Sequence, residues 1–216
     1  MIIDVDIVSD FVCPWCFIGA RRLRVAVALA CADIPELEVR PCWLPFFLNP
    51  DSPPAGEPYL PFLERKFGGR AQVEAIFERV RAAGRPYGVD YAFEKIALRA
   101  NTLQAHRLAH WAQAQGPAEA LIDRIYVGQF QRGEHIGDPA VLTAIAAECG
   151  YDPATVADYL ASDRDRDVVV GQEREVHAMG INQVPTFLLP GGRVIVGAED
   201  PAVLAAGLRE VAWQRH

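Results

Sequence analysis

Apolar and polar residues alternate in two short segments near the amino terminus. Residues 2–8 carry isoleucine or valine at every second position, a pattern that predicts a half-buried β-strand. Residues 36–44 alternate in the same way, and Pro41 places this second strand at a sheet edge or near a bulge. Between them, apolar residues recur at helical spacing as far as about Ala32. The first part of the chain is therefore expected to fold as strand, helix and strand.

The middle of the chain has a different pattern. Residues 45–58 contain five prolines and predict an irregular connection. From about residue 59 to 180, every periodic segment has helical spacing. The segment from Asn101 to Gln104 has the form of a capping box, in which the asparagine accepts an N–H group of the first turn and the glutamine reaches back. Further helices are expected to start at Pro117, Asp138-Pro139 and Asp152-Pro153.

The last part of the chain returns to strands. A polar helix is expected to end at Gly180. Strands at 184–189 and 193–196 follow, joined by a turn, and Asp200 caps a final helix. No internal repeat interrupts this order of strands and helices.

Together the two ends predict an α/β fold. Strand–helix–strand followed by helix, hairpin and helix is the arrangement of a small mixed sheet with helices on both faces. The sheet domain is expected to consist of residues 1–55 and 165–216, and residues 56–164 to form a large all-helical insertion.

The motif Cys13-Pro14-Trp15-Cys16 follows the first strand and opens the first helix. Pro14 suits the first position of a helix, and the positive end of the helix dipole favours the thiolate form of Cys13. Cys16 lies one turn later, where its thiol can resolve a mixed disulfide on Cys13. The motif predicts thiol–disulfide exchange, with Pro14 and Trp15 in the active-site loop.

Two other interpretations of this cysteine pair stay open. A structural zinc site would need a second ligand pair, but the remaining cysteines are isolated and have no histidine nearby at ligand spacing, so we expect no metal. Two buried, inert cysteines are the other alternative, which the position between strand and helix disfavours. The isolated residues Cys31, Cys42 and Cys149 are expected to be small apolar fillers.

Val184-Pro185 stands where a strand begins after a helix and a short loop. A cis peptide bond at this position would be a built-in feature, and the backbone of Val184 would be free to pair with an extended substrate beside Cys13 and Cys16. The alternative is an ordinary edge-strand proline. Because the cysteine motif also follows a strand, we prefer the interpretation that Pro185 is a cis-proline beside the active site.

Four segments carry a resemblance to a known family: IVSDFVCPWCFIGARRL, NTLQAHRL, YVGQFQRGEHIGD and QVPTFLL. Together they resemble the DsbA-like thioredoxin-fold oxidoreductases, and within them the FrnE-type proteins described as dithiol–disulfide isomerases. The resemblance covers nearly the whole chain. It implies a thioredoxin fold with a helical insertion, Cys13 as nucleophile, Cys16 as resolving thiol and Pro185 as the cis-proline.

Three functional classes follow. The leading hypothesis is an oxidoreductase or isomerase that acts on a disulfide or dithiol in a peptide or small molecule. No bound cofactor is expected, and glutathione is a candidate redox partner. The superfamily also contains 2-hydroxychromene-2-carboxylate isomerases and kappa-class glutathione transferases, which typically have serine in place of the first cysteine; Cys13 and Cys16 argue against that role. The third class is a non-enzymatic module that uses the disulfide as a binding switch.

Three further polar residues are candidates for a role in the chemistry. Asp10 precedes Cys13 by three residues and is expected to be a loop or cap residue, with action on the Cys13 proton as the alternative. His106 and His110 share one helical face, but no acidic or cysteine partner lies nearby in sequence, so we expect core or surface histidines rather than metal ligands. A position of His106 facing the cysteines from the insertion stays open.

Composition limits the partners and the compartment. A net charge of −7 and a pI near 5.2 argue against nucleic acid as a partner. The longest apolar stretch, 25–32, is far shorter than the roughly 18–20 residues of a membrane span. The terminus at Met1 lacks the basic and apolar regions of a signal peptide, and five cysteines leave one unpaired, so a cytoplasmic protein is expected. Cys149 is expected at a helix end, where a disulfide between two chains could form, so a homodimer stays open.

Overall fold

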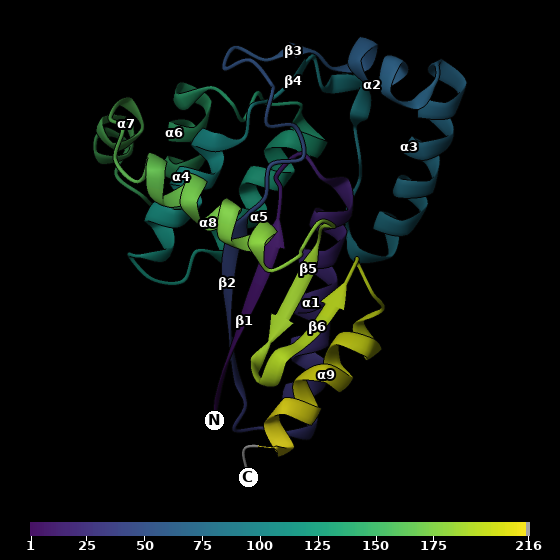
Figure 1. Cartoon of the computed structure of the whole chain (residues 1–216), viewed down its shortest axis with the longest axis vertical. Coiled ribbons are helices and arrows are strands. Elements are labelled where there is room, and N and C mark those ends of the chain that lie inside the picture. The colour runs from purple at the N-terminus through teal and green to yellow at the C-terminus, as the bar shows by residue number, and fades with distance from the viewer. Residues whose placement is uncertain (215–216) are drawn as a thin grey trace.

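The structure is a computed structural model that describes residues 1–214. A four-stranded sheet holds the strands in the order β2 (Glu38–Pro45), β1 (Ile2–Ser9), β5 (Thr186–Leu189) and β6 (Arg193–Val196) (Figure 1). Strand β1 pairs in parallel with β2 and antiparallel with β5, and β5 pairs antiparallel with β6. The sheet therefore joins the two ends of the chain and is mixed, as the sequence pattern predicts.

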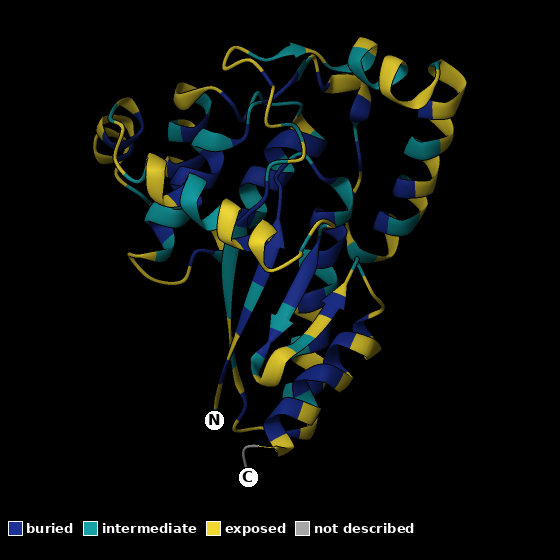
Figure 2. Ribbon diagram, in the orientation of Figure 1, coloured by how far each residue is buried: buried dark blue, intermediate teal, exposed yellow. Residues whose placement is uncertain are grey.

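Helices cover both faces of this sheet. Helices α1 (Pro14–Asp33) and α9 (Pro201–Trp213) pack together on the face that carries the buried residues Ile3, Val5 and Ile7. Helix α8 (Arg166–Ala178) lies on the opposite face, where Val176 contacts Val8 of β1. Burial follows this layering, since β1 is dark blue over most of its length, α8 alternates between yellow and teal, and α9 alternates between dark blue and yellow (Figure 2).

The segment between β2 and α8 is mainly helical. It contains β3 (Glu57–Pro58), α2 (Tyr59–Phe67), α3 (Arg70–Gly84), β4 (Leu98–Arg99), α4 (Leu103–Gln113), α5 (Glu119–Val127), α6 (Pro139–Glu148) and α7 (Pro153–Ala161). Short helical turns occupy 85–87, 93–95, 128–132 and, outside this segment, 190–192. Helices α2 and α3 stand on one side above the sheet, and α4 to α7 on the other (Figure 1).

One apolar core connects this helical segment to the cysteine motif. Phe17 of α1 stacks on Tyr126 of α5 with ring centroids 5.2 Å apart, and Phe11 lies 5.0 Å from the same ring. Cys13 and Cys16 belong to this core as well. The proposed division into residues 1–55 with 165–216 and residues 56–164 stays a prediction, and its last two residues, 215 and 216, lie outside the described part of the chain.

The Asp-Pro starts of the helices are confirmed. The side chains of Asp138, Asp152 and Asp200 accept N–H groups of Ala140, Thr155 and Ala202 at 2.8 Å each. These residues lie in the first turns of α6, α7 and α9, so each aspartate satisfies a backbone donor that has no partner within the helix.

Two predictions about the insertion are wrong. The insertion is not all helical, because Glu57 and Pro58 pair antiparallel with Leu98 and Arg99, where Arg99 also forms an ion pair with Glu57. The helix expected at Pro117 begins at Glu119, two residues beyond the Gly-Pro turn.

The capping box is only half formed. Asn101 Oδ1 accepts from the N–H of Leu103 at 3.1 Å, but Gln104 Oε1 accepts from Arg107 at 2.6 Å instead of reaching back. A buried guanidinium offers Gln104 a charge-assisted bond, which is stronger than a bond between neutral groups.

The three isolated cysteines are half-buried, and Cys31 and Cys149 pack against the apolar core as expected of small apolar fillers. Two of them lie toward the ends of helices, where packing is incomplete, and their thiols donate to backbone carbonyls: Cys31 to Leu37 at 3.2 Å and Cys149 to Ala120 at 3.8 Å. Cys42 lies on the edge strand β2.

Candidate active site

The cysteine motif opens helix α1 as predicted. Cys13 is the N-cap residue, with extended backbone angles of φ −91° and ψ 111°, and Pro14 occupies the first helical position. The N–H group of Cys13 donates to the carbonyl of Asp10 at 3.0 Å, which closes the turn between β1 and α1. No acidic side chain occupies the first turn. The helix dipole therefore acts on the sulfurs without a competing carboxylate in that turn.

The two thiols differ in access. Both are free, and Cys13 is 5% exposed while Cys16 is 1% exposed. Burial raises the pKa of Cys16 well above its ordinary value, and a hydrogen bond with Cys13 and the charge of Cys13 raise it further. The sulfurs are thus close to each other, and the Cys16 thiol keeps its proton at neutral pH. Cys13 is the more exposed of the two.

The Val184-Pro185 segment lies beside Cys13. The peptide bond between Val184 and Pro185 is cis, and the carbonyl of Val184 accepts from Cys13 Sγ at 3.8 Å. The carbonyl of Pro185 accepts from the N–H of Gly197 at 2.7 Å, which ties the loop to the end of β6. The structure therefore brings together two segments that are 171 residues apart in the sequence.

Gly19 explains how closely this loop approaches α1. A Cβ atom at this position would lie only 2.8 Å from Cγ of Pro185 and 3.3 Å from the ring of Phe187. Such distances force a shift in the loop, so glycine is required for the proline ring to pack against the helix. The hydrophobic pattern does not single out Gly19, although a glycine inside a helical pattern is a visible signal of close packing.

The helical insertion also holds the active-site loop. The Tyr91 hydroxyl donates to the carbonyl of Pro14 at 2.5 Å, and the tyrosine is 6% exposed. Burial raises the pKa of this phenol, so it stays a neutral donor. Pro14, Trp15 and Val184 are half-buried, which leaves part of each on the surface near Cys13. No sequence pattern linked Tyr91 to the motif, because 77 residues separate it from Pro14.

Asp10 and His106 meet beneath the motif. His106 Nε2 lies 3.3 Å from Asp10 Oδ1, and both side chains are buried. The loop role expected for Asp10 is present too, because its other carboxylate oxygen accepts from the N–H of Leu48 at 2.8 Å. His106 thus contacts the loop residue three positions before Cys13, whereas His110 one turn later is half-buried. A position of His106 facing the cysteines themselves stays a prediction.

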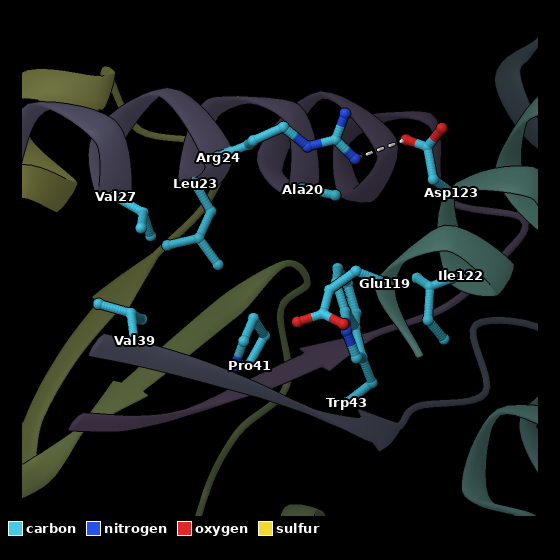
Figure 3. A pocket seen from close by; sticks show the side chains of 10 residues that line it. All are labelled: Ala20, Leu23, Arg24, Val27, Val39, Pro41, Trp43, Glu119, Ile122 and Asp123. Atoms are coloured by element: carbon cyan, nitrogen blue, oxygen red, sulfur yellow. Dashed lines mark hydrogen bonds and ion pairs between the residues drawn. The ribbon is translucent and has the colours of Figure 1, made fainter. Parts of the chain in front are cut away.

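A separate hollow of about 180 Å³ lies between α1, β2 and α5 (Figure 3). Leu23, Val27 and Trp43 line it, and Arg24 forms an ion pair with Asp123 at its rim (Figure 3). The lining residues include neither cysteine of the motif nor Pro185. This hollow is therefore distinct from the site of the paired thiols. The place of Trp15 in the active-site loop and the pairing of the Val184 backbone with a substrate stay predictions.

A mixed sheet flanked by helices, with a cysteine pair at a helix start beside a cis-proline, defines a thioredoxin-like protein. The family comparison agrees, since the DSBA-like thioredoxin domain family matches residues 4–209. The chain belongs to this family, whose members are disulfide oxidoreductases or isomerases. The family and fold predicted from the sequence are confirmed.

Three individual proteins are similar to this chain in sequence or structure. The probable DsbA oxidoreductase SCO1869 from Streptomyces coelicolor is 30% identical, with a TM-score of 0.88 over 99% of this chain and 92% of that one. The uncharacterized protein YwbO from Bacillus subtilis is 27% identical over 97% of this chain and 98% of its own length. The cytosolic disulfide reductase DsbM from Pseudomonas aeruginosa, 21% identical, has a TM-score of 0.64 over 98% of each chain and is alike in fold. Within residues 1–214, no helix is long and apolar enough to cross a membrane.

Proposed function

We propose that this protein is a thiol–disulfide oxidoreductase in which Cys13 is the nucleophile and Cys16 the resolving thiol. The observation that carries the proposal is the pair itself: two thiols in one helical turn, both buried but Cys13 the less so at 5% against 1% exposed, with Cys13 beside the carbonyl of Val184. A helix start favours the thiolate of a cysteine at its N-cap, and the thiolate is the attacking species in disulfide exchange.

The reaction has two steps. The Cys13 thiolate attacks a substrate disulfide, a Cys13–substrate disulfide forms, and the other substrate sulfur leaves as a thiolate. Cys16 then loses its proton and attacks Cys13, so that the Cys13–Cys16 disulfide forms and the second substrate thiol is released. The same steps in reverse oxidise a substrate dithiol. The greater burial of Cys16 supports the attack by Cys13 before the attack by Cys16, because the Cys16 sulfur can reach a substrate only once that substrate is bound to Cys13.

The substrate class follows from the surroundings of Cys13. The Val184 carbonyl and the half-buried faces of Trp15 and Val184 favour an extended segment or a flat molecule that carries a disulfide. We propose a protein or small-molecule disulfide as substrate, glutathione as the exchanging thiol and a reducing, cytoplasmic compartment. Support for the compartment comes from the unpaired Cys31 and Cys42, which an oxidising environment would put at risk.

Replacement of single cysteines tests the proposal. The probe is a peptide with an internal disulfide between a fluorophore and a quencher, with dithiothreitol as the reductant. We expect Cys13→Ser to abolish turnover and Cys16→Ser to accumulate a mixed disulfide on Cys13, detectable by mass. The matched control Cys149→Ser is expected to keep full turnover, because Cys149 lies at the end of α6, away from the motif.

Two outcomes would favour the other classes. If Cys13→Ser leaves turnover unchanged while glutathione transfer or isomerisation continues, the protein is a glutathione-dependent enzyme. If no turnover occurs but partner binding follows the redox state of Cys13 and Cys16, the pair is a switch. Either result contradicts the oxidoreductase proposal.

A further inference from the structure

The hollow between α1, β2 and α5 lies where two apolar clusters of the protein meet (Figure 3). Leu23 belongs to the cluster that α1 and α9 form on the sheet, and Ile122 belongs to the cluster of the helical insertion. Trp43, on β2, packs against both clusters. Such a junction between separately packed parts of a fold is a preferred place for small-molecule sites.

Trp43 brings an unsatisfied hydrogen-bond donor to this hollow. Its Nε1 atom is buried and has no hydrogen-bond partner within residues 1–214. The indole is part of the lining and rises from β2 between Pro41 and Ile122 (Figure 3). Buried polar groups are nearly always hydrogen-bonded, and a donor without a partner costs free energy. An acceptor atom placed in the hollow would remove that cost.

The donor is presented by a residue that is held in place. Gln113 Oε1 accepts from the backbone N–H of Trp43 at 2.6 Å, and Gln113 Nε2 donates to the Trp43 carbonyl at 3.2 Å. The glutamine amide thus occupies the free edge of β2 at this residue. The Trp43 ring also lies 6.4 Å from the Tyr126 ring at an interplanar angle of 60°. A side chain fixed in this way loses little conformational freedom when a ligand binds to it.

The size and the walls of the hollow limit what fits. Its volume is about 180 Å³. An apolar cavity of about 150 Å³ takes up one benzene ring, so there is room here for a single ring with a small substituent. The walls are mainly aliphatic: Ala20, Leu23, Val27, Val39, Pro41 and Ile122. They favour an apolar ring over a polar molecule of the same size.

The charged residues of the lining favour a ligand without net charge. Arg24, Glu119 and Asp123 complete the lining. Asp123 is already paired with Arg24, at 3.4 Å, and with Arg21 of the same helix, at 2.8 Å. The two positive charges and the two negative charges of these four residues cancel. A charged ligand would therefore lose its hydration without meeting an excess of the opposite charge.

We propose that this hollow is a binding site for an uncharged single-ring molecule that carries a hydrogen-bond acceptor, such as an aromatic ketone. The ring packs against Leu23, Val27 and Ile122, and the acceptor receives the N–H of Trp43 Nε1. Neither thiol of the cysteine motif takes part, so the site is independent of the proposed oxidoreductase function. Because one wall is α1, the ligand binds the folded state and stabilises the helix that the motif opens.

The experiment is a titration of the isotope-labelled, full-length protein, followed by the NMR signals of the indole N–H groups. The chain has four tryptophans, and the Trp43 signal is identified by its loss in Trp43→Phe. The probe is acetophenone. Its matched control ligand is isopropenylbenzene, in which a CH₂ group replaces the ketone oxygen. Benzoate and benzylammonium serve as the negatively and positively charged probes.

We expect acetophenone to shift the Trp43 signal with a dissociation constant of about 1 mM or tighter, an affinity within reach of a molecule of this size. The signals of Trp15, in the cysteine motif, and Trp213, on α9, should stay in place. Isopropenylbenzene should bind about three- to tenfold more weakly, which is the net contribution of one hydrogen bond. Both charged probes should also bind more weakly than acetophenone.

Two variants separate the donor from the walls, with binding read from the backbone amide signals of residues 20–27. Trp43→Phe keeps an aromatic ring but lacks the N–H group, so it should weaken acetophenone about three- to tenfold and leave isopropenylbenzene unchanged. Val27→Phe puts a ring of the protein into the hollow and should abolish binding of both. The matched control Val25→Phe should bind as the parent does, because Val25 is 41% exposed on the same helix and does not line the hollow.

A rival explanation is that the Glu119 carboxylate accepts the Trp43 N–H in solution. In that case Glu119→Ala frees the donor and should strengthen acetophenone binding about tenfold, whereas we expect a change below about twofold.

Four results would overturn the proposal: such a strengthening, a shift of Trp15 in place of Trp43, equal affinities for acetophenone and isopropenylbenzene, or no binding of any probe. If Val27→Phe does not fold, the comparison of the two ligands on the parent and on Trp43→Phe decides by itself.

Discussion

Arg107 is the largest fully buried side chain of the described residues, and its replacement gives a measurable test of the fold. The guanidinium binds backbone carbonyls of the segment that joins α7 to α8. Its shortest bonds to backbone carbonyls go to Ser162, at 2.7 Å, and Arg164, at 2.6 Å, and a third goes from Nε to Arg164 at 3.0 Å. The Tyr159 hydroxyl donates to the Arg107 carbonyl at 3.1 Å. The side chain therefore fixes this connection against α4.

The cost of removing the guanidinium can be worked out from these bonds. Arg107→Met keeps the aliphatic volume but leaves the carbonyls of Ser162 and Arg164 without their short bonds. Each unsatisfied carbonyl costs about 1–3 kcal/mol, which gives about 2–6 kcal/mol for the two. Because both carbonyls are only partly buried, water relieves some of this cost, and we expect a loss of about 3 kcal/mol in the free energy of unfolding. The melting temperature should fall by roughly 10 °C.

Urea unfolding followed by circular dichroism measures the effect. The control is Arg79→Met on the exposed side of α3, for which we expect a change below about 0.5 kcal/mol. Amide hydrogen exchange in residues 159–165 should also become faster in Arg107→Met. A loss equal to that of the control, with unchanged exchange, would refute the argument that this guanidinium holds the connection.

Three further predictions concern titration and the active-site loop. Because its pKa is raised by burial, Cys16 should resist iodoacetamide until the pH is well above 9.0, as read by peptide mass; ready alkylation at pH 8 would contradict this. Tyr91→Phe removes the bond to the loop carbonyl and should cost about 0.5–1.5 kcal/mol in urea unfolding, whereas Tyr87→Phe should cost less. A hydrogen bond from Arg124 lowers the pKa of Glu148 from 4.5 to about 2, so Glu148 stabilises the fold above pH 4.5 and loses this effect as the pH falls toward 2. The stability gap between the parent and Glu148→Gln should shrink over that range, and a gap independent of pH would be evidence against the pairing.

Local sequence signals predicted most of the sheet domain. Alternation at 2–8 and 36–44 corresponds to β1 and β2, and the Asp-Pro pairs mark helix starts because both the cap and the first helical position are set by neighbouring residues. The start of α1 at the cysteine motif was predicted in the same way, because Pro14 suits the first helical position.

Long-range partners could not be predicted in this way. The contact of His106 with Asp10 and the bond from Tyr91 to Pro14 depend on how the insertion folds back, and no periodicity encodes that distance. The same applies to Gln104, which the sequence assigns to a capping box but which Arg107 engages once the core has formed. Tertiary contacts override local preference at these positions.

The central claim is that Cys13 and Cys16 form a reversible redox pair. Its most direct test is the equilibrium of these two thiols against glutathione buffers, read by thiol alkylation and mass, with the other three cysteines replaced by serine. We expect a reversible two-electron transition with a midpoint in the range of about −120 to −270 mV that cysteine pairs of this kind span. If no disulfide forms between Cys13 and Cys16 at any glutathione ratio, the account is contradicted.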